Sequence, residues 1–317
     1  MTLVVRVANI REEAIDIRSF ELASADGSAL PAYTPGSHID VHLKPGLTRQ
    51  YSLCGAPGES ERYMIAVKLE TNSRGGSAAM HALNVGDTLT IGTPRNNFAL
   101  QAGASHHLLI AGGIGITPLL GMARELSAAN ASFDLQYFTR SLEHAAFHEL
   151  LSQPAFRGKV KFHYALDPDR VRAYLRRLLW HRPDGAHMYL CGPKPFMDLV
   201  ETTAAPTWQP EAVHLEYFSA DPASLSEQGE AFEVAIATTG ACYTIPVDKS
   251  IAQVLAENGT LVPTSCEQGV CGTCLTGVLE GEPDHRDVFL TDDEKRAGDR
   301  MMVCVSRARS RRITLDL

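Results

Sequence analysis

Four cysteines near the C-terminus have the spacing of an iron–sulfur site. Cys266, Cys271 and Cys274 lie in the run Cys-Glu-Gln-Gly-Val-Cys-Gly-Thr-Cys, and Cys304 follows well downstream. This is the C-x4-C-x2-C…C spacing of a plant-type two-iron cluster, in which one loop supplies three thiolates and a separate element the fourth. Glycines in the loop let backbone N–H groups approach the sulfurs. The spacing therefore predicts a [2Fe–2S] cluster and a role in electron transfer.

The spacing also bears on two other uses of four cysteines. A structural zinc site is normally built from two separated C-x2-C pairs, whereas here three cysteines share one loop. A disulfide framework is not expected, because the N-terminal residues soon become charged and show no apolar signal segment. We expect an iron–sulfur protein of the reducing cytoplasm. The alternative to the iron–sulfur site is a zinc-bearing interaction module, in which the cysteines serve structure only. Cys54 and Cys242 fit no ligand spacing, and we interpret both as ordinary thiols.

Composition limits the class of partner. The chain has 317 residues, 44% hydrophobic and 21% charged, which is enough for two or three globular domains. Its net charge of −8 argues against nucleic acid as a partner, because phosphate binding requires a basic surface. Residues 230–317 hold 14 acidic and 9 basic side chains, a net of −5. A partner protein with a basic docking surface would complement this segment; a solvated acidic surface is the alternative.

The pattern of apolar residues changes along the chain. Short alternating runs punctuated by Gly and Pro predict an antiparallel barrel up to about residue 103. Continuous apolar runs and a helix over 118–126 then predict a parallel α/β segment. This segment is followed by a stretch of small and polar residues at 219–230 that is typical of a linker. The predicted strands are 4–7, 39–43, 63–67 and 88–91 in the barrel, and 107–111, 135–138, 160–164 and 187–190 in the α/β segment.

Two motifs in the barrel could bind a flavin phosphate. Arg49, Tyr51 and Ser52 place a cation, an aromatic ring and a hydroxyl on one short strand. The turn Arg74-Gly-Gly-Ser77 precedes a short helical stretch, an arrangement in which free N–H groups cradle phosphate; Ser77 is expected to cap this helix. By itself, the strand could equally be an ordinary half-exposed strand, and the turn a plain helix start.

Two glycine-containing turns in the α/β segment could bind a dinucleotide. The run from Gly112 to Pro118 follows an apolar strand and opens a helix, although the full G-x-G-x-x-G fingerprint is absent. Cys191-Gly192-Pro193 follows another strand and should reach the same carboxyl edge of the sheet, where open α/β sheets bind ligands. A buried thiol at a strand end is the alternative for Cys191.

The chain resembles the phthalate dioxygenase reductase-like family, a branch of the ferredoxin–NADP reductase superfamily. The resemblance rests on the two barrel motifs, the two glycine-containing turns and the cysteine loop, which occur together and in this order. The resemblance covers nearly the whole chain. It implies an FMN-binding antiparallel β-barrel at 1–103, an NAD-binding α/β domain with a parallel sheet at 104–222, a linker at 223–230, and a β-grasp, α+β ferredoxin domain at 231–317.

The resemblance also implies roles for individual residues. Ser52, Thr117 and Cys191 would border the place of hydride transfer, and Phe218 would cover the other face of the flavin. Arg140 follows a predicted strand where the adenosine ribose would lie and is compatible with either nucleotide; we expect NADH. The implied flavin contacts are Arg49, Tyr51, Ser52, Val67, Lys68, Gly75, Gly76 and Ser77, and the implied nucleotide contacts are Gly112, Gly113, Gly115, Thr117, Arg140, Cys191 and Gly192.

These cofactors predict a function. NADH delivers two electrons as a hydride and a cluster accepts one at a time, so a flavin between them matches the two. The chain has no Cys-x-His triplet, as a Rieske cluster would require, and the resemblance implies that a separate Rieske-type oxygenase receives the electrons from a monomeric reductase. The alternatives are a self-contained reductase of small acceptors such as ferric chelates or quinones, and a redox sensor. The histidines, including His38 and His42, are interpreted as structural or surface groups.

Overall fold

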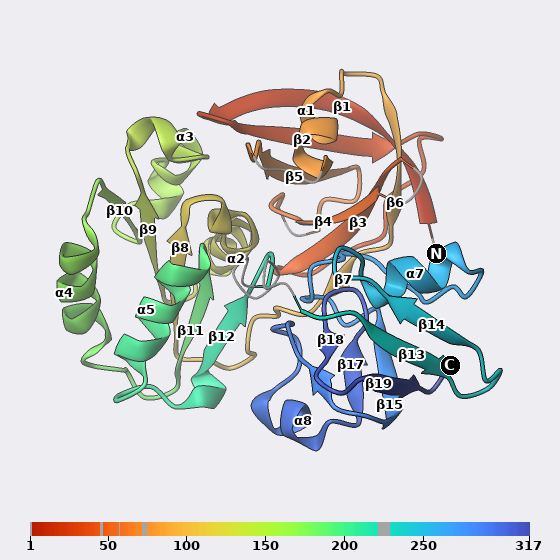
Figure 1. Ribbon diagram of the computed structural model, residues 1–317. Helices are drawn as coiled ribbons and strands as arrows, with labels where there is room; N and C mark the ends of the chain where they lie inside the picture. Colours follow the sequence, from red (N-terminus) through yellow and green to blue (C-terminus); the bar gives the residue numbers. More distant parts are fainter. Residues whose placement is uncertain (1, 45–46, 57, 72–74, 221–228) are drawn as a thin grey trace. The chain divides into compact units, whose positions relative to one another are not determined.

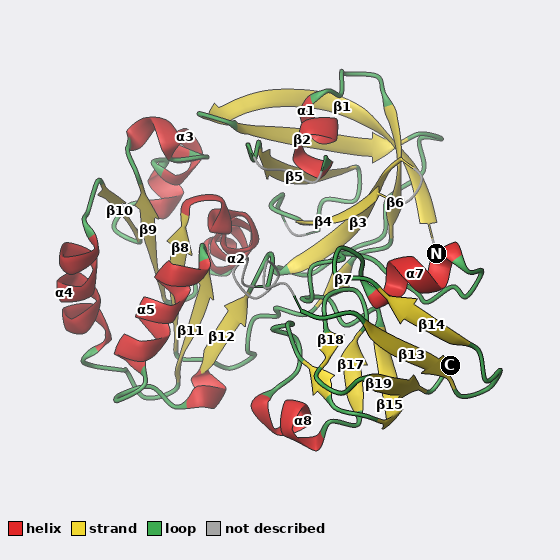
Figure 2. Cartoon of the chain, in the orientation of Figure 1, coloured by secondary structure: helices red, strands yellow, loops and turns green. Residues whose placement is uncertain are grey.

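The computed structural model describes residues 2–44, 47–56, 58–71, 75–220 and 229–317. The chain divides into two compact units, Met1–Glu216 and Tyr217–Leu317 (Figure 1). Arg74 of the predicted phosphate turn lies outside the described residues, as does the predicted linker apart from Gly229 and Glu230. Each unit is built around its own sheets (Figure 2).

The first unit begins with an antiparallel sheet in the order β4-β3-β6-β1-β2-β5, with β7 paired to β3. A bridge between Leu53 and Ile65 joins the ends of the order and closes the sheet into a barrel. Val5 and Val7 are fully buried while Val4 beside them is exposed, the period-two pattern of a half-buried strand. The elements are β1 Thr2–Ala14, β2 Ile17–Ser24, β3 Ser37–Lys44, β4 Leu47–Ser52, β5 Arg62–Lys68, α1 Gly76–His81, β6 Thr88–Gly92 and β7 Arg95–Asn96.

The first unit continues with a five-stranded sheet in the order β10-β9-β8-β11-β12, in which every pair is parallel. The order of the strands reverses between β8 and β11, and such a switch point opens a crevice at the carboxyl ends of the strands. Helix α2 contacts β8, β9 and β11, while α4 and α5 pack on each other. The elements are β8 His106–Gly112, α2 Ile116–Ala128, β9 Phe133–Thr139, α3 His148–Leu151, β10 Val160–Tyr164, α4 Pro168–Leu179, β11 Ala186–Cys191, α5 Lys194–Ala204 and β12 Val213–Glu216.

Helix α2 joins the two sheets of the first unit through one hydrophobic core. Leu119 and Leu120 of α2 are fully buried and cluster with Cys54 and Ala66 from the barrel and with Tyr189 from the parallel sheet. A Cβ at Gly121 would lie 3.2 Å from the carbonyl oxygen of Leu53, so the helix backbone approaches the barrel closely at this point. The barrel and the parallel sheet are therefore held as one body.

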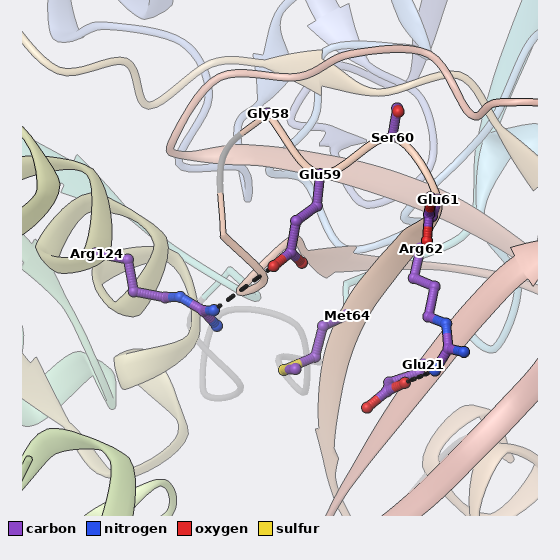
Figure 3. Close-up of a pocket in the computed structure, with 8 residues that line it drawn as sticks. All are labelled: Glu21, Gly58, Glu59, Ser60, Glu61, Arg62, Met64 and Arg124. Carbon is purple, nitrogen blue, oxygen red and sulfur yellow. Dashed lines mark hydrogen bonds and ion pairs between the residues drawn. The ribbon is translucent and has the colours of Figure 1, made fainter.

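A pocket of about 540 Å³ lies at the surface of the same unit (Figure 3). Arg62 is paired with Glu21 at 2.6 Å, and Arg124 with Glu59 at 3.9 Å. None of the predicted site residues lines this pocket. The lining residues are Glu21, Gly58, Glu59, Ser60, Glu61, Arg62, Met64 and Arg124.

The second unit is a mixed sheet with a helix, as in a β-grasp. The sheet order is β14-β13-β19-β15-β17; β13 and β19 are parallel and the other pairs antiparallel. Helices α7 and α8 each begin with a capping box, formed by Ser250 with Gln253 and by Thr291 with Glu294. The elements are β13 Phe232–Ile236, β14 Cys242–Ile245, α7 Ile251–Glu257, β15 Leu275–Glu280, β16 Pro283–Asp284, α8 Asp292–Ala297, β17 Arg300–Met302, β18 Arg307–Ala308 and β19 Arg312–Leu315.

The described part of the chain contains no helix that is both long enough and apolar enough to cross a membrane.

Candidate functional site

The predicted phosphate turn brings Arg49 of β4 against the start of α1. Gly75 has φ +92°, and a Cβ at Gly76 would lie 2.6 Å from Cγ of Arg49. The turn therefore needs Gly75 for its backbone conformation and Gly76 for the close approach of the Arg49 side chain. The Arg49 side chain is largely buried and donates to the carbonyl of Thr48 at 2.7 Å. A buried guanidinium beside a two-glycine turn fits an anionic group such as a phosphate.

The predicted role of Ser77 as a helix cap is wrong. The N-cap residue is Gly75, without a side-chain cap, and the hydroxyl of Ser77 instead accepts a hydrogen bond from the N–H of Glu70 at 3.1 Å. Because the helix starts two residues earlier than the cap prediction requires, Ser77 lies within the first turn. Its hydroxyl holds the chain between β5 and the turn.

The remaining predicted flavin residues lie on β4 and β5. Tyr51 is half-buried, and burial raises the pKa of its phenol to about 12, so it stays neutral. Lys68 is paired with Glu70 at 2.7 Å. The side chain of Val67 packs in the barrel core, and its carbonyl bonds the ring of His81. The lining role predicted for Val67 and Lys68 stays a prediction.

The carboxyl edge of the parallel sheet is formed by two turns in direct contact. A Cβ at Gly115 would lie 2.2 Å from the carbonyl oxygen of Cys191, and one at Gly192 would lie 3.1 Å from Cα of Gly112. A Cβ at Gly112 would meet the ring of Phe196 at 2.8 Å. These glycines are therefore required by the packing of the β8 turn against the β11 turn, at the switch point of the sheet.

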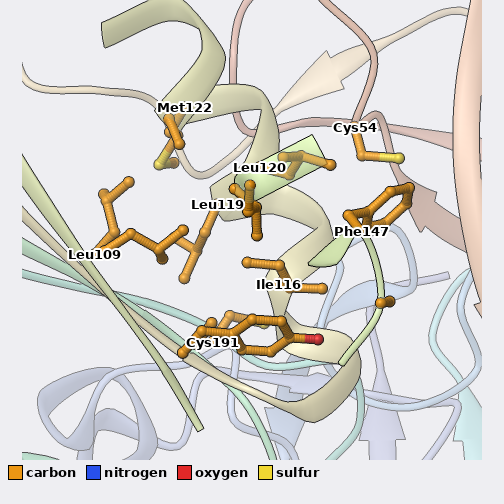
Figure 4. Close-up of a cluster of buried hydrophobic side chains, with 14 of the residues drawn as sticks. Cys54, Leu109, Ile116, Leu119, Leu120, Met122, Phe147 and Cys191 are labelled. Carbon is orange, nitrogen blue, oxygen red and sulfur yellow. The ribbon is translucent and has the colours of Figure 1, made fainter. Parts of the chain in front are cut away.

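Two of the residues predicted to border hydride transfer are buried at this edge. Thr117 lies in the first turn of α2 and donates to the carbonyl of Ile114 at 3.0 Å. Cys191 is fully buried in the core cluster beneath Ile116 (Figure 4). Burial and the neighbouring Glu216 carboxyl raise the pKa of the Cys191 thiol well above its usual range. Cys191 is therefore a neutral thiol rather than a nucleophile.

Glu216 connects this edge to the barrel, although it belongs to none of the sequence motifs. It is the last residue of β12 and pairs in register with Cys191. The hydroxyl of Ser52 donates to its carboxyl at 3.4 Å. Burial of the carboxyl raises the pKa of Glu216 to about 8, against the smaller lowering effect of the Ser52 hydrogen bond. A carboxyl group that holds its proton at neutral pH thus lies between Ser52 and Cys191.

The last two predicted contacts are not brought into this group. Arg140 is exposed and follows the end of β9 at Thr139, whose hydroxyl bonds the carbonyl of Ser141. Phe218 belongs to the second unit and is 40% exposed. Their nucleotide and flavin contacts stay predictions.

Four of the five cysteines of the second unit approach one another in two pairs. Hydrogen bonds join the thiols of Cys266 and Cys271, and those of Cys274 and Cys304. Within the described residues, no three His, Cys, Asp or Glu side chains surround a single point as ligands of one metal ion would. A two-iron cluster takes two protein ligands on each iron, and two thiol pairs match this arrangement.

Backbone N–H groups point at these sulfurs. Gln268 and Val270 donate to Cys266, the first at 3.3 Å, and Gly269 donates to Cys304. Hydrogen bonding with Cys266 and Thr273 lowers the pKa of Cys271, whereas hydrogen bonding with the partner thiol and burial raise the pKa of Cys266 and of Cys304. The backbone N–H donors around the sulfurs favour thiolates, the form in which cysteine binds iron. The loop residues therefore fit a [2Fe–2S] cluster.

Packed glycine turns at the carboxyl edge of a parallel sheet and paired thiols on a cluster-type loop occur together in one class of protein, the pyridine-nucleotide oxidoreductases that combine a flavin with an iron–sulfur cluster. Comparison with known proteins identifies the family within this class. Residues 234–309 match the family described as "2Fe-2S iron-sulfur cluster binding domain". Residues 93–210 match "Dimethylamine monooxygenase subunit DmmA-like, N-terminal domain".

Whole-length relatives agree with these matches. A vanillate O-demethylase oxidoreductase of Pseudomonas sp. strain HR199 is 46% identical over 98% of each chain. A phthalate dioxygenase reductase of Burkholderia cepacia is 41% identical over 99% of this chain and 97% of its own. A solved phthalate dioxygenase reductase structure, 40% identical, matches all of this chain and 98% of its own with a TM-score of 0.83. The chain belongs to the phthalate dioxygenase reductase-like family. It is an NADH-dependent oxidoreductase with FMN and a [2Fe–2S] cluster.

Proposed function

We propose that this reductase transfers electrons from NADH to a separate Rieske-type oxygenase that demethylates or hydroxylates an aromatic acid. A methoxylated aromatic acid is the substrate best supported, because the vanillate O-demethylase oxidoreductase relative is 46% identical over 98% of each chain. We further propose that the protein is a monomer and acts in a reducing cytoplasm, where its cysteines would stay reduced.

In this proposal the first unit carries out the two-electron half of the reaction. Bound FMN would supply the conversion between hydride and single-electron transfer. Arg49 and the Gly75–Gly76 turn would hold the flavin phosphate, and the packed glycine turns would admit the nucleotide backbone. Ser52, Thr117 and Cys191 would border the nicotinamide and exclude water, and Glu216 would hold a proton beside the Ser52 hydroxyl.

The second unit carries out the one-electron half. Cys266, Cys271, Cys274 and Cys304 would hold the cluster, and the N–H groups around them would stabilise the charge it gains on reduction. Two observations together support the proposal: the Ser52–Glu216–Cys191 contact in the first unit and the paired thiols in the second. With both, a two-electron site and a one-electron site are expected in the same chain.

Reconstitution tests the partner and the substrate class. The full-length holoprotein would be mixed with NADH, vanillate and the oxygenase component of a vanillate O-demethylase, and formaldehyde release from the methoxy group would be measured. We expect formaldehyde only when both proteins are present, with about one NADH consumed per molecule formed. A parallel assay with phthalate and the oxygenase component of a phthalate dioxygenase tests the hydroxylating alternative; because phthalate has no methoxy group, the hydroxylated product and the NADH consumed would be measured instead of formaldehyde.

A self-contained reductase of small acceptors predicts a different result. It would oxidise NADH with ferric chelates or quinones at full rate and would reduce neither oxygenase. That outcome would overturn the proposed partner while leaving the assignment of the cofactors intact.

A further inference from the structure

A buried residue at the entrance to the second unit is bonded to the cluster loop. Ala220 lies four residues after Glu216, the last residue of the first unit, and its side chain is fully buried. Its N–H donates to the carbonyl oxygen of Gln268 at 2.9 Å. Gln268 lies between the ligands Cys266 and Cys271, so the segment that enters the second unit is fixed directly to the loop that holds three thiols.

The peptide unit that accepts this bond is also a donor to a cluster ligand. The carbonyl of Gln268 and the N–H of Gly269 belong to the same peptide plane, and that N–H donates to the sulfur of Cys304. One peptide therefore connects the Ala220 N–H to a cysteine of the Cys274–Cys304 pair.

The next peptide along the loop repeats the arrangement for the other pair. The N–H of Val288 donates to the carbonyl of Gly269 at 3.1 Å, and the N–H of Val270, in the same peptide plane as that carbonyl, donates to Cys266. Each thiol pair thus receives a hydrogen bond from a peptide whose carbonyl is itself hydrogen-bonded. One of these outer donors comes from within the β-grasp, and the other, Ala220, from the entering segment.

The two peptides meet at Gly269. Its φ is +73°, and a Cβ there would lie 2.8 Å from Cγ2 of Val305 and 3.0 Å from Cα of Asp287. Only glycine therefore fits the loop conformation that presents both peptides, because any side chain at this position would displace a neighbouring segment.

Hydrogen bonds in series strengthen one another, because a donor on the carbonyl polarises the peptide and makes its N–H a better donor. A stronger bond to sulfur stabilises the more negative, reduced form of a cluster. We propose that Ala220 is a positioning residue that raises the reduction potential of the [2Fe–2S] cluster through the Gln268–Gly269 peptide. The proposal rests on the four thiols holding the cluster, and it makes the entering segment part of the cluster's environment.

Removal of a single N–H tests the proposal. Ala220→Pro eliminates the donor, while Ser219→Pro places the same ring one residue earlier and keeps the Ala220 N–H; the N–H of Ser219 makes no hydrogen bond within the described part of the chain. Ala220→Gly keeps the donor and removes only the methyl group. Each full-length holoprotein would be titrated electrochemically, with cluster reduction followed by EPR and flavin reduction by absorbance.

We expect Ala220→Pro to lower the ratio of reduced to oxidised cluster at a fixed ambient potential by about two- to fivefold, where a tenfold change would equal about 59 mV for one electron. The flavin midpoint should not move, and Ser219→Pro and Ala220→Gly should match the unchanged protein. If Ala220→Pro and Ser219→Pro gave the same cluster midpoint, the relay would be refuted.

An ester at position 220 covers the case in which the proline variant loses its cluster. Replacing alanine by lactic acid exchanges the N–H for an oxygen and keeps the shape of the chain. The same two- to fivefold fall is expected, and an unchanged cluster midpoint in the ester protein would refute the relay. Because potentials are read without any oxygenase, this result is independent of whether the proposed partner is correct.

Discussion

Among single residues, Glu216 should have the largest effect on the pH dependence of stability. Its pKa is raised to about 8 in the folded chain from an ordinary value of 4.5. Between these values the unfolded chain releases the proton and the folded chain keeps it, so stability falls as the pH rises from about 4.5 to about 8. We expect Glu216→Gln to be more stable than the unchanged protein at pH 9, by up to a few kcal/mol, and equally stable near pH 4.

The measurement is the midpoint of urea unfolding of the first unit at several pH values, followed by the fluorescence of Trp180 and Trp208, because both tryptophans lie in this unit. Ser52→Ala is a suitable control, because it removes the hydroxyl bonded to this carboxyl without removing the titrating group. A difference between Glu216→Gln and the unchanged protein that did not vary with pH would show that Glu216 does not carry a raised pKa.

The ligand set can be tested by serine substitution. Cys304→Ser removes a sulfur from the Cys274–Cys304 pair and should abolish the EPR signal of the reduced cluster, because an iron then loses one of its two protein ligands. Cys242→Ser is the matched control, since Cys242 is exposed at the start of β14. Loss of the cluster in Cys242→Ser but not in Cys304→Ser would contradict the assignment.

At the scale of elements, all eight strands predicted from apolar runs are present, with the four of the α/β segment parallel to their neighbours. These runs are long and regular, so local pattern and tertiary structure agree. The spacing of the cysteines alone also indicated the cluster loop, because three of the four predicted ligands lie close together along the chain. The role of Ser77 was not predictable, since the start of a six-residue helix depends on the conformation of one glycine.

At the sheet edge Gly115 is required by packing and not by its backbone conformation, whereas the nearby Gly113 has φ +55°. Gly115→Ala places a Cβ 2.2 Å from the Cys191 carbonyl oxygen, so the two turns must separate. We expect the rate of flavin reduction by NADH to fall about tenfold to a hundredfold, because the nucleotide would be displaced from its reacting position. Stopped-flow absorbance of the full-length holoprotein measures this rate.

Gly158→Ala is the matched control in the same unit. Gly158 has φ +77°, and a Cβ at this position would meet no atom within 4 Å, so alanine there costs about 1–2 kcal/mol of local strain but leaves the sheet edge unchanged. If Gly158→Ala slowed flavin reduction as much as Gly115→Ala, the close contact with Cys191 would not be the cause.

For the whole molecule, packing joins two segments that the pattern of apolar residues separates, the barrel and the parallel sheet. The barrel and the parallel sheet share a core that includes Cys54, Ala66 and Leu120, and Glu216 reaches Ser52 across their boundary. The Ser52–Glu216 contact joins residues 164 positions apart, and no pattern within one sequence reports such a contact. Glu216 therefore could not be predicted as a site residue from the sequence, whereas the role of Phe218, two residues later, was implied only by the family resemblance.

The net charge of the second unit predicts how the rate of electron transfer to the oxygenase depends on ionic strength. Residues 230–317 carry a net charge of −5, and helix α8 begins with Asp292, Asp293 and Glu294. If a basic surface receives this unit, electron transfer to the oxygenase should slow as ionic strength rises from about 0.01 M to about 0.15 M, where the Debye length falls from about 30 Å to about 8 Å. Stopped-flow mixing of the reduced reductase with oxidised oxygenase gives the second-order rate.

Cluster reduction by NADH within the reductase is the internal control, because it involves no second protein. Its rate at saturating NADH should change little over the same range of salt. An intermolecular rate that increased with salt would indicate that the partner presents an acidic surface instead.

The distribution of thiols has a practical consequence for attaching a single probe to the second unit. Cys54 and Cys191 are buried with raised pKa values, and four more cysteines form the thiol pairs of the cluster site. Cys242 is therefore the one position open to a maleimide in the holoprotein. A fluorophore or spin label attached there without any mutagenesis would report its distance to the flavin, turnover by turnover.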